Sequence, residues 1–101
     1  MESVAVPVGG AETSAGTVTV RYWASARAAA GVPGDQIPVP GPVSLAEVRR
    51  LAAELHPGRL ESVLAVCSVL LGDRPVAARD PAQVEVLPGD QVEFLPPFAG
   101  G

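Results

Sequence analysis

Lysine is absent from the sequence, so all seven basic residues are arginine. The arginines are scattered along the chain, whereas a nucleic-acid-binding protein usually gathers its cations into one patch or stripe. The net charge is −4. We therefore expect no direct binding to nucleic acid.

Cysteine occurs once, at Cys67, which excludes an internal disulfide and is typical of a protein from a reducing compartment. The first ten residues lack the cationic start of a signal peptide, and Pro7 and Gly9 interrupt their apolar run. No apolar run is long enough to span a bilayer. We expect a cytoplasmic protein that does not bind membranes.

Aromatic residues make up only 4% of the chain, so its core must be built mainly from Val, Leu and Ala. The length of 101 residues and the hydrophobic content of 48% are typical of one globular domain.

Signatures of catalysis and metal binding are missing as well. The sequence contains no HExxH, no CxxC, no phosphate-binding glycine loop and no recognisable set of serine, histidine and acid. We interpret Cys67 as a small core residue and the single histidine, His56, as a helix cap or surface residue. Glu47, Glu54 and Glu61 are expected to face water. We expect no active site, no metal and no bound cofactor in this chain.

The first part of the chain predicts a tail, a strand and a short helix. Residues 1–16 lack a sustained apolar face and are expected to form a flexible N-terminal tail. Apolar and polar residues alternate over 17–23, which indicates a strand. The Ala-rich segment 24–31 predicts a short helix that ends at Gly31. Two prolines in residues 36–40 place that extended segment at a sheet edge.

The clearest helix signal covers residues 44–56, where Ser44 and Glu47 form a capping box. One face of this helix is predicted to be apolar and carries Leu45, Val48, Leu51, Ala52 and Leu55. Residues 63–72 form a continuous apolar run that favours a buried strand, although its length also fits a helix. A turn and a short return strand near Val76 are expected to follow.

Residues 87–90, LPGD, have the chemistry of a type II turn and lead into a last strand, 91–95. In that strand Phe94 should point into the core and Leu95 away from it. The elements together predict an α+β fold in which a mixed sheet packs on one main helix. The first and last strands are expected to lie side by side and parallel.

The predicted domain, residues 17–95, is followed by an extended tail, residues 96–101. Its two prolines favour a stiff polyproline conformation. Gly100 and Gly101 lack a Cβ, so they can enter a slot that excludes other residues. A carboxylate at Gly101 is a poor electrophile until it becomes an acyl-adenylate. The tail therefore implies a partner that uses ATP.

Two stretches resemble the MoaD and ThiS families of sulfur carriers, which are β-grasp, ubiquitin-like proteins. Residues 88–101, PGDQVEFLPPFAGG, are similar to the family tail GD-x-V-x-F-x-PP-x-AGG. Residues 18–31 are similar to the opening of the molybdopterin synthase small subunit, at Tyr22, Trp23, Ala24, Arg27 and Gly31. Ala28 departs from the family, which often has Glu there, and residues 70–76 replace its usual Val-Asn-Gly turn.

The resemblance implies a sulfur carrier with two protein partners. A MoeB/ThiF-like adenylyltransferase or sulfurtransferase would use ATP to convert Gly101 to an acyl-adenylate and then to a thiocarboxylate. The tail would next enter the MoaE-like large subunit of molybdopterin synthase, where the thiocarboxylate supplies sulfur for the molybdenum cofactor. Gly100 and Gly101 would thread the slot. The residues expected to bind the partners are Leu95, Pro96, Pro97, Phe98 and Ala99.

Three alternatives stay open from the sequence. Leu95 and Phe98 could pack back on their own domain instead of on a partner. A sulfur carrier for thiazole, cysteine or tRNA thiolation would use the same tail. A ubiquitin-like protein modifier would join Gly101 to a target, and without lysine this chain could not form polymers through its own side chains.

Overall fold

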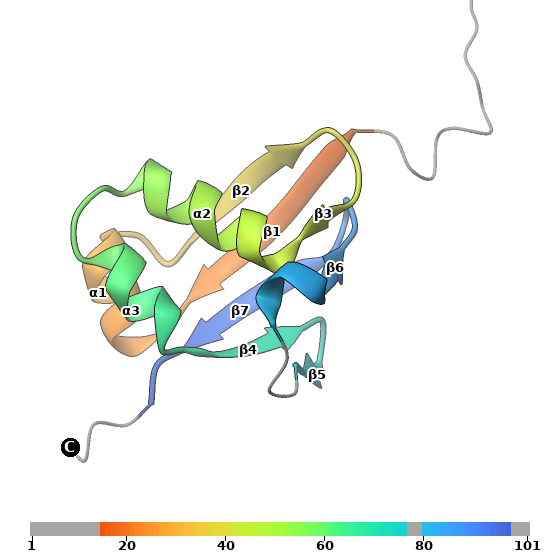
Figure 1. Cartoon of the computed structure of the whole chain (residues 1–101). Helices are drawn as coiled ribbons and strands as arrows, with labels where there is room; N and C mark the ends of the chain where they lie inside the picture. Colours follow the sequence, from red (N-terminus) through yellow and green to blue (C-terminus); the bar gives the residue numbers. More distant parts are fainter. Residues whose placement is uncertain (1–14, 77–79, 98–101) are drawn as a thin grey trace, which may run out of the picture.

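The computed structural model describes residues 15–76 and 80–97, in which α2 (Leu45–Leu55) and α3 (Leu60–Ala65) cover one face of a sheet (Figure 1). The five strands of that sheet are, in chain order, β1 (Gly16–Tyr22), β2 (Gly34–Val39), β4 (Ser68–Leu71), β5 (Arg74–Pro75) and β7 (Gln91–Leu95). In space they follow the order β2-β1-β7-β4-β5. The predicted α+β architecture is confirmed.

The first and last strands lie side by side and parallel in the middle of the sheet. Their register pairs Tyr22 with Phe94 and Arg21 with Glu93. The other strand pairs of this sheet are antiparallel, so the sheet is mixed, as predicted. β2 lies at the edge of the sheet, as predicted. Its Pro38 has no N–H to donate to a neighbouring strand, which is tolerated in an edge strand because one side of that strand is unpaired.

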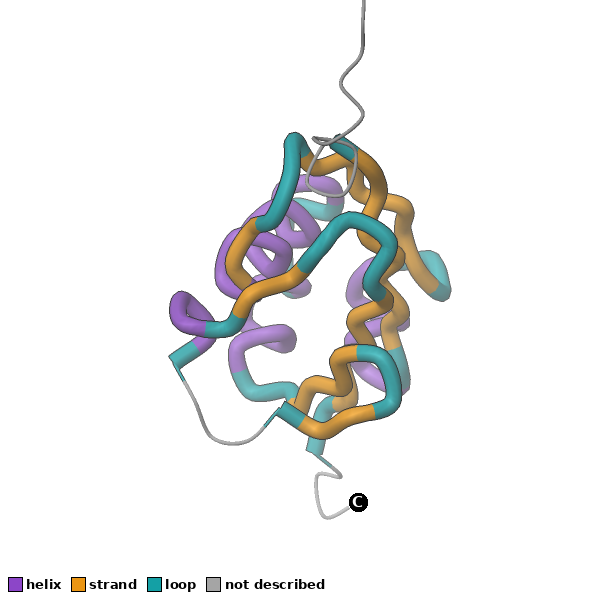
Figure 2. The backbone as a smooth tube through the Cα atoms, turned by 90° about the vertical axis from the view of Figure 1, so that its right-hand side faces the viewer, coloured by secondary structure: helices purple, strands orange, loops and turns teal. Residues whose placement is uncertain are grey.

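A second, two-stranded sheet joins β3 (Val43–Ser44) and β6 (Glu85–Val86) beside the short 3₁₀ helix η2 (Pro81–Gln83). Figure 2 shows the backbone from the side, with helices, strands and loops in different colours. The chain passes from β6 to β7 through the turn at residues 87–90. In this turn the Asp90 N–H donates to the Leu87 carbonyl at 2.9 Å, and Gly89 has a φ of 96°. The predicted type II turn is therefore present, with glycine where a positive φ is required.

The predicted end of the first helix at Gly31 and the predicted start of the main helix at Ser44 are both observed. α1 (Ala24–Ala30) ends at Gly31, whose φ is 81° and whose N–H donates to the Arg27 carbonyl. α2 begins after Ser44, whose Oγ accepts a hydrogen bond from the Glu47 N–H at 3.0 Å. The Glu47 carboxylate accepts hydrogen bonds from Arg50, so the structure shows the Ser44 half of the capping box.

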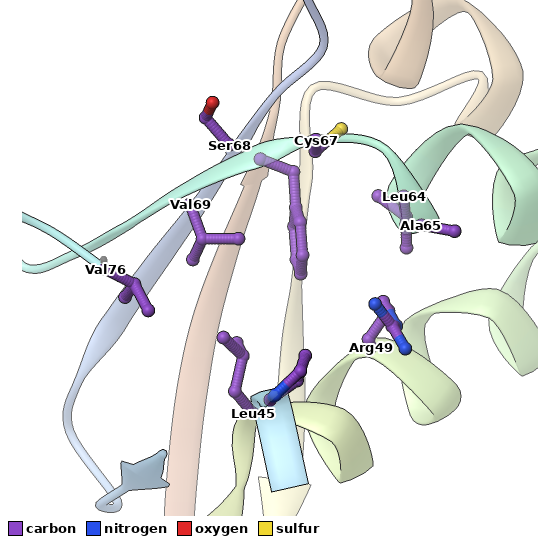
Figure 3. A pocket seen from close by; sticks show the side chains of 10 residues that line it. Leu45, Arg49, Leu64, Ala65, Cys67, Ser68, Val69 and Val76 are labelled. Atoms are coloured by element: carbon purple, nitrogen blue, oxygen red, sulfur yellow. The ribbon is translucent and has the colours of Figure 1, made fainter. Parts of the chain in front are cut away.

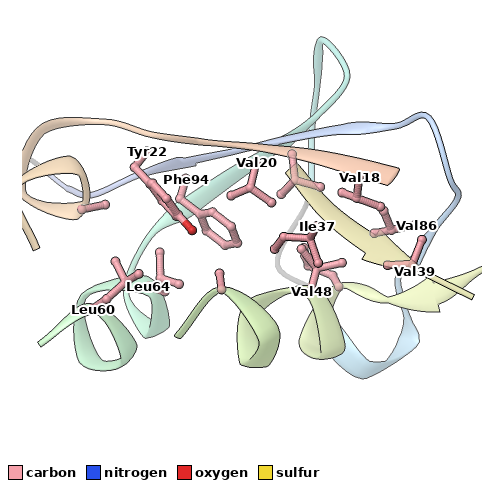
Figure 4. Packing of buried hydrophobic residues seen from close by; sticks show 14 of the residues in the cluster. Val18, Val20, Tyr22, Ile37, Val39, Val48, Leu60, Leu64, Val86 and Phe94 are labelled. Carbon is pink, nitrogen blue, oxygen red and sulfur yellow. The ribbon is translucent and has the colours of Figure 1, made fainter. Parts of the chain in front are cut away.

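The core fills the space between the sheet and the helices (Figure 4). Alternate residues of the two central strands face the helices and are fully or almost fully buried, namely Val18, Val20, Tyr22, Val92 and Phe94. The helices contribute Leu45, Val48 and Ala52 from α2 and Leu60 and Leu64 from α3. The core is thus mainly aliphatic, as the composition predicts.

Two sequence expectations about local structure were wrong. The apolar run at 63–72 is not one strand: its first residues belong to α3, and β4 begins only at Ser68. Leu55 is 53% exposed and does not join the apolar face of α2, because it is the last residue of the helix. At the other end of the chain, β1 begins at Gly16, and the rest of the predicted N-terminal tail, residues 1–14, lies outside the described residues.

Candidate functional site

The root of the predicted tail lies at the carboxyl end of β7, the central strand of the main sheet (Figure 1). Because β1 is parallel to β7 and β4 is antiparallel, the end of β1 and the start of β4 flank this point. Leu95 pairs with Ser68 of β4. The Trp23 N–H, just beyond β1, donates to the Phe94 carbonyl at 3.2 Å. The tail is therefore attached to a strand that is paired on both sides.

The side chains at the root separate into core and surface as predicted. Phe94 is fully buried, whereas Leu95 is half-buried on the opposite face of the sheet. Pro96 is half-buried and Pro97 is exposed. The other predicted site residues, Phe98, Ala99, Gly100 and Gly101, lie outside the described residues. Their proposed roles stay predictions.

An aromatic and charged cluster on the outer face of the sheet was not foreseen from the sequence. The Trp23 Nε1–H donates to Glu93 Oε1 at 2.9 Å, and the Arg21 guanidinium carbon lies 5.3 Å from the centre of the Trp23 ring. Trp23 remains 41% exposed. Glu93 is far from Arg21 and Trp23 in sequence, so only the β1–β7 register could have revealed that the three residues meet.

A second unforeseen cluster joins the sheet to the end of α2. The Tyr22 hydroxyl donates to Asp35 Oδ2 at 2.7 Å, and His56 Nε2 lies 2.6 Å from the same oxygen. Burial raises the pKa of the Tyr22 hydroxyl, and the adjacent Asp35 raises it further, so Tyr22 is a hydrogen-bond donor at neutral pH. His56 is the C-cap of α2 and packs edge-on against the Tyr22 ring. The predicted cap position of His56 is confirmed.

Cys67 and Arg49 line a cavity of about 480 Å³ between α2, α3 and β4 (Figure 3). Phe94 lines it as well. Its Sγ lies 3.3 Å from the Val63 carbonyl, to which it can donate. Burial raises the pKa of the Cys67 thiol to about 11. A thiol with this pKa is almost entirely protonated at neutral pH, so it is a poor nucleophile. The interpretation of Cys67 as a structural residue agrees with this environment.

This environment predicts slow alkylation of Cys67. At pH 7 the thiolate fraction should be about a hundredfold lower than for a thiol with a pKa two units lower, since each unit is a factor of ten. Iodoacetamide should therefore label the folded chain much more slowly than the chain unfolded in urea, and the rate should rise up to a pH of about 11. Equal rates for the folded and unfolded chain would contradict the buried, protonated thiol.

Within 15–76 and 80–97, no three His, Cys, Asp or Glu side chains are arranged so that they could hold a metal ion. None of the described helices has the length and hydrophobicity needed to cross a membrane.

Comparison with known proteins identifies the family. A sequence model of the ThiS family matches residues 20–101, which is most of the chain. The chain belongs to the ThiS family. One relative of this ThiS-family chain is the molybdopterin synthase sulfur carrier subunit of Aspergillus niger. The two are 35% identical over 85 residues, which cover 84% of this chain and 94% of the relative.

Solved structures show the same fold. A chain from the complex of subunits 1 and 2 of the molybdopterin-converting factor from Helicobacter pylori is 26% identical, with a TM-score of 0.58. The match covers 84% of the ThiS-family chain and 99% of that chain. Small archaeal modifier protein 1 of Haloferax volcanii is 17% identical, with a TM-score of 0.69, and the match covers 82% and 99% of the two chains. The predicted ubiquitin-like β-grasp fold is confirmed.

Proposed function

We propose that this chain is a sulfur carrier whose terminal carboxylate, on Gly101, is adenylated, converted to a thiocarboxylate and then used as a sulfur donor for molybdopterin biosynthesis. In this role it is the small subunit of molybdopterin synthase. The observation that carries the proposal is the 35% identity to the sulfur carrier subunit of Aspergillus niger over 94% of that protein. The match to the ThiS family, which runs through residue 101, supports it.

The proposed chemistry has two steps. A carboxylate oxygen of Gly101 attacks the α-phosphorus of ATP, which releases pyrophosphate and leaves an acyl-adenylate. Sulfide-level sulfur then attacks the acyl carbon, the carbon–oxygen bond to the phosphate breaks, and AMP leaves. The chain itself contributes only the carboxylate and the backbone that presents it. We accordingly propose that it has no active site and no bound cofactor, and that its partner uses the ATP.

Two partners follow from this cycle. A MoeB/ThiF-like adenylyltransferase or sulfurtransferase activates the tail, and a MoaE-like large subunit receives the sulfur-loaded tail. The matched Helicobacter pylori structure, a complex of two subunits, supports the second partner. The position of Leu95 on the outer face supports contact with a partner at the root of the tail. Pro96, Pro97, Phe98 and Ala99 extend this contact, and we place the whole cycle in the cytoplasm.

The intact mass of the chain recovered from its own cells tests this function against the alternatives. A carrier should appear partly as a species heavier by the difference between one sulfur and one oxygen atom. A protein modifier should instead appear joined through Gly101 to larger proteins. Deleting the gene for this chain should abolish molybdopterin formation. An effect on thiazole, cysteine or tRNA thiolation alone would assign the carrier to another pathway.

A further inference from the structure

The main sheet has two edge strands of very different length. Among residues 15–76 and 80–97, β2 pairs only with β1 and β5 pairs only with β4. β2 spans six residues, whereas β5 spans two. The unpaired N–H and C=O groups of an exposed edge strand can pair with a strand of another molecule, which leads to self-association. β2 is therefore the edge at which a second copy of the chain has most to bind.

The register of β1 and β2 shows which backbone groups of β2 face this edge. The Tyr22 N–H donates to the Pro33 carbonyl at 2.9 Å, so this pair is a hydrogen-bonded one. Hydrogen-bonded and non-hydrogen-bonded pairs alternate along an antiparallel ladder. Every second residue of β2 therefore directs its backbone N and carbonyl away from β1. These residues are Gly34, Gln36 and Pro38.

The hydrogen bonds of β1 lead to the same assignment. The Thr19 N–H donates to the Asp90 carbonyl at 3.0 Å, and the Thr17 carbonyl accepts from the turn before β7 at 2.8 Å. The backbone groups of these two threonines are thus used on the side of β7. Thr19 lies opposite Gln36, and Thr17 lies opposite Pro38. Gln36 and Pro38 consequently face the free edge of the described sheet.

Proline interrupts the row of donors along this edge. Pro38 has no N–H, and its ring occupies the space that the carbonyl of an added strand would need. Pro40, just beyond the strand, has no N–H either. Suppose that two copies of β2 met about a twofold axis, with Gln36 opposite Gln36. Each Pro38 would then oppose Gly34 of the other copy, and a hydrogen bond would be missing at both ends of the ladder.

The short edge strand has the same feature. The Val76 N–H donates to the Val69 carbonyl at 2.9 Å, which makes this pair hydrogen-bonded. Pro75 and Leu70, the next pair along the ladder, are therefore non-hydrogen-bonded. The backbone N of Pro75 faces away from β4 and has no proton to donate. Both edges of the described sheet thus carry a proline at an outward-facing position.

We propose that Pro38 prevents the edge of β2 from pairing with a second copy of this chain, and that Pro75 does the same at β5. The surface concerned is the backbone edge of the sheet, and the partner that it excludes is an identical strand. The chain is monomeric in solution as a result. This inference is independent of sulfur carriage, because it rests only on the strand register and on the prolines.

Sedimentation equilibrium of the full chain over a range of concentrations tests the inference. The unchanged chain should remain monomeric. Pro38→Thr should raise the association constant by at least about tenfold, because the restored N–H forms a hydrogen bond in both copies and threonine favours strands. Pro57→Thr is the matched control, since Pro57 is equally an exposed proline but lies in the turn after α2. It should leave the chain monomeric.

Amide hydrogen exchange, followed by NMR, locates the contact. In the unchanged chain, the N–H groups of Gly34 and Gln36 should exchange much faster than those of Asp35 and Ile37, which face β1. In Pro38→Thr, the Gly34 and Gln36 amides should become protected as the concentration rises. The comparison within the unchanged chain needs no variant, so it tests the edge even if Pro38→Thr fails to fold.

Four results would overturn the inference. Pro38→Thr could remain as monomeric as the unchanged chain, or it could associate without protecting Gly34 and Gln36. Pro57→Thr could associate as strongly as Pro38→Thr, which would show that the loss of any exposed proline has this effect. Slow exchange of the Gly34 and Gln36 amides in the unchanged chain would show that this edge is already paired. None of these results bears on thiocarboxylate formation at Gly101, so the proposed function is tested separately.

Discussion

Adding one alanine after Gly101 is expected to reduce thiocarboxylate formation by about a hundredfold or more. The extra residue moves the reactive carboxylate out of register with the adenylating site, and a misplacement of about 1 Å can cost roughly a hundredfold in rate. Gly100→Val should block the reaction as well, because a β-branched side chain does not fit a slot that admits only backbone. The measurement is the initial rate of the mass increase with the adenylating partner, ATP and a sulfur source.

Cys67→Ser is the control for these tail variants. Its thiol is half-buried and hydrogen-bonded to the Val63 carbonyl, so its loss should leave the rate of sulfur loading unchanged. The extended chain and the Gly100 variant should retain the thermal stability of the unchanged chain, since their substitutions lie beyond β7. Normal loading of the extended chain would show that the carboxylate of Gly101 is not the reactive group.

Phe94→Ala is expected to lower the free energy of unfolding by about 3–5 kcal/mol, the usual cost of removing a buried phenylalanine side chain. Phe94 is fully buried, and its ring stacks on Tyr22 with the centroids 6.4 Å apart. A domain of this size typically has only about 5–15 kcal/mol of stability. The variant should therefore unfold at much lower urea concentration, as far-UV circular dichroism would show.

Leu55→Ala provides the comparison for Phe94→Ala. Leu55 is also a large apolar residue, but 53% of it is exposed at the end of α2. Its replacement should change the free energy of unfolding by about 0.5 kcal/mol or less, as is usual for surface positions. Similar losses for the two variants would contradict the burial described for Phe94.

Local chemistry predicted the parts of the fold that depend on neighbouring residues. Ser44 caps α2, Gly31 ends α1 and Gly89 occupies the turn, and in each case one residue satisfies a requirement of the backbone beside it. Alternation predicted that Phe94 is buried and Leu95 is not. The parallel pairing of the first and last strands also followed, because each has one strongly apolar face.

The run at 63–72 could not be assigned from the sequence, because a continuously apolar segment has no period. In the structure, Leu60 and Leu64 lie one helical turn apart and are both buried, which fixes α3. The helix ends before Cys67, and the chain then enters β4. Tertiary burial, rather than local propensity, decides where helix gives way to strand.

The candidate site also has one part that the sequence predicts and another part that only the structure shows. The Gly-Gly tail is visible in the sequence because its chemistry needs only adjacent residues. The cluster on the outer face depends on Arg21 and Trp23 meeting Glu93 across two paired strands. The second cluster depends on Asp35 meeting His56. Neither pairing has a local signal, so the structure was needed to find them.

The most direct test of sulfur carriage is the mass of the chain after incubation with the adenylating partner, ATP and a sulfide donor, followed by fragmentation. The intact mass should increase by the difference between one sulfur and one oxygen atom. Fragments should place the added sulfur on Gly101, and omission of ATP should prevent the change. An unchanged mass in the complete reaction, or sulfur located on Cys67, would contradict the account.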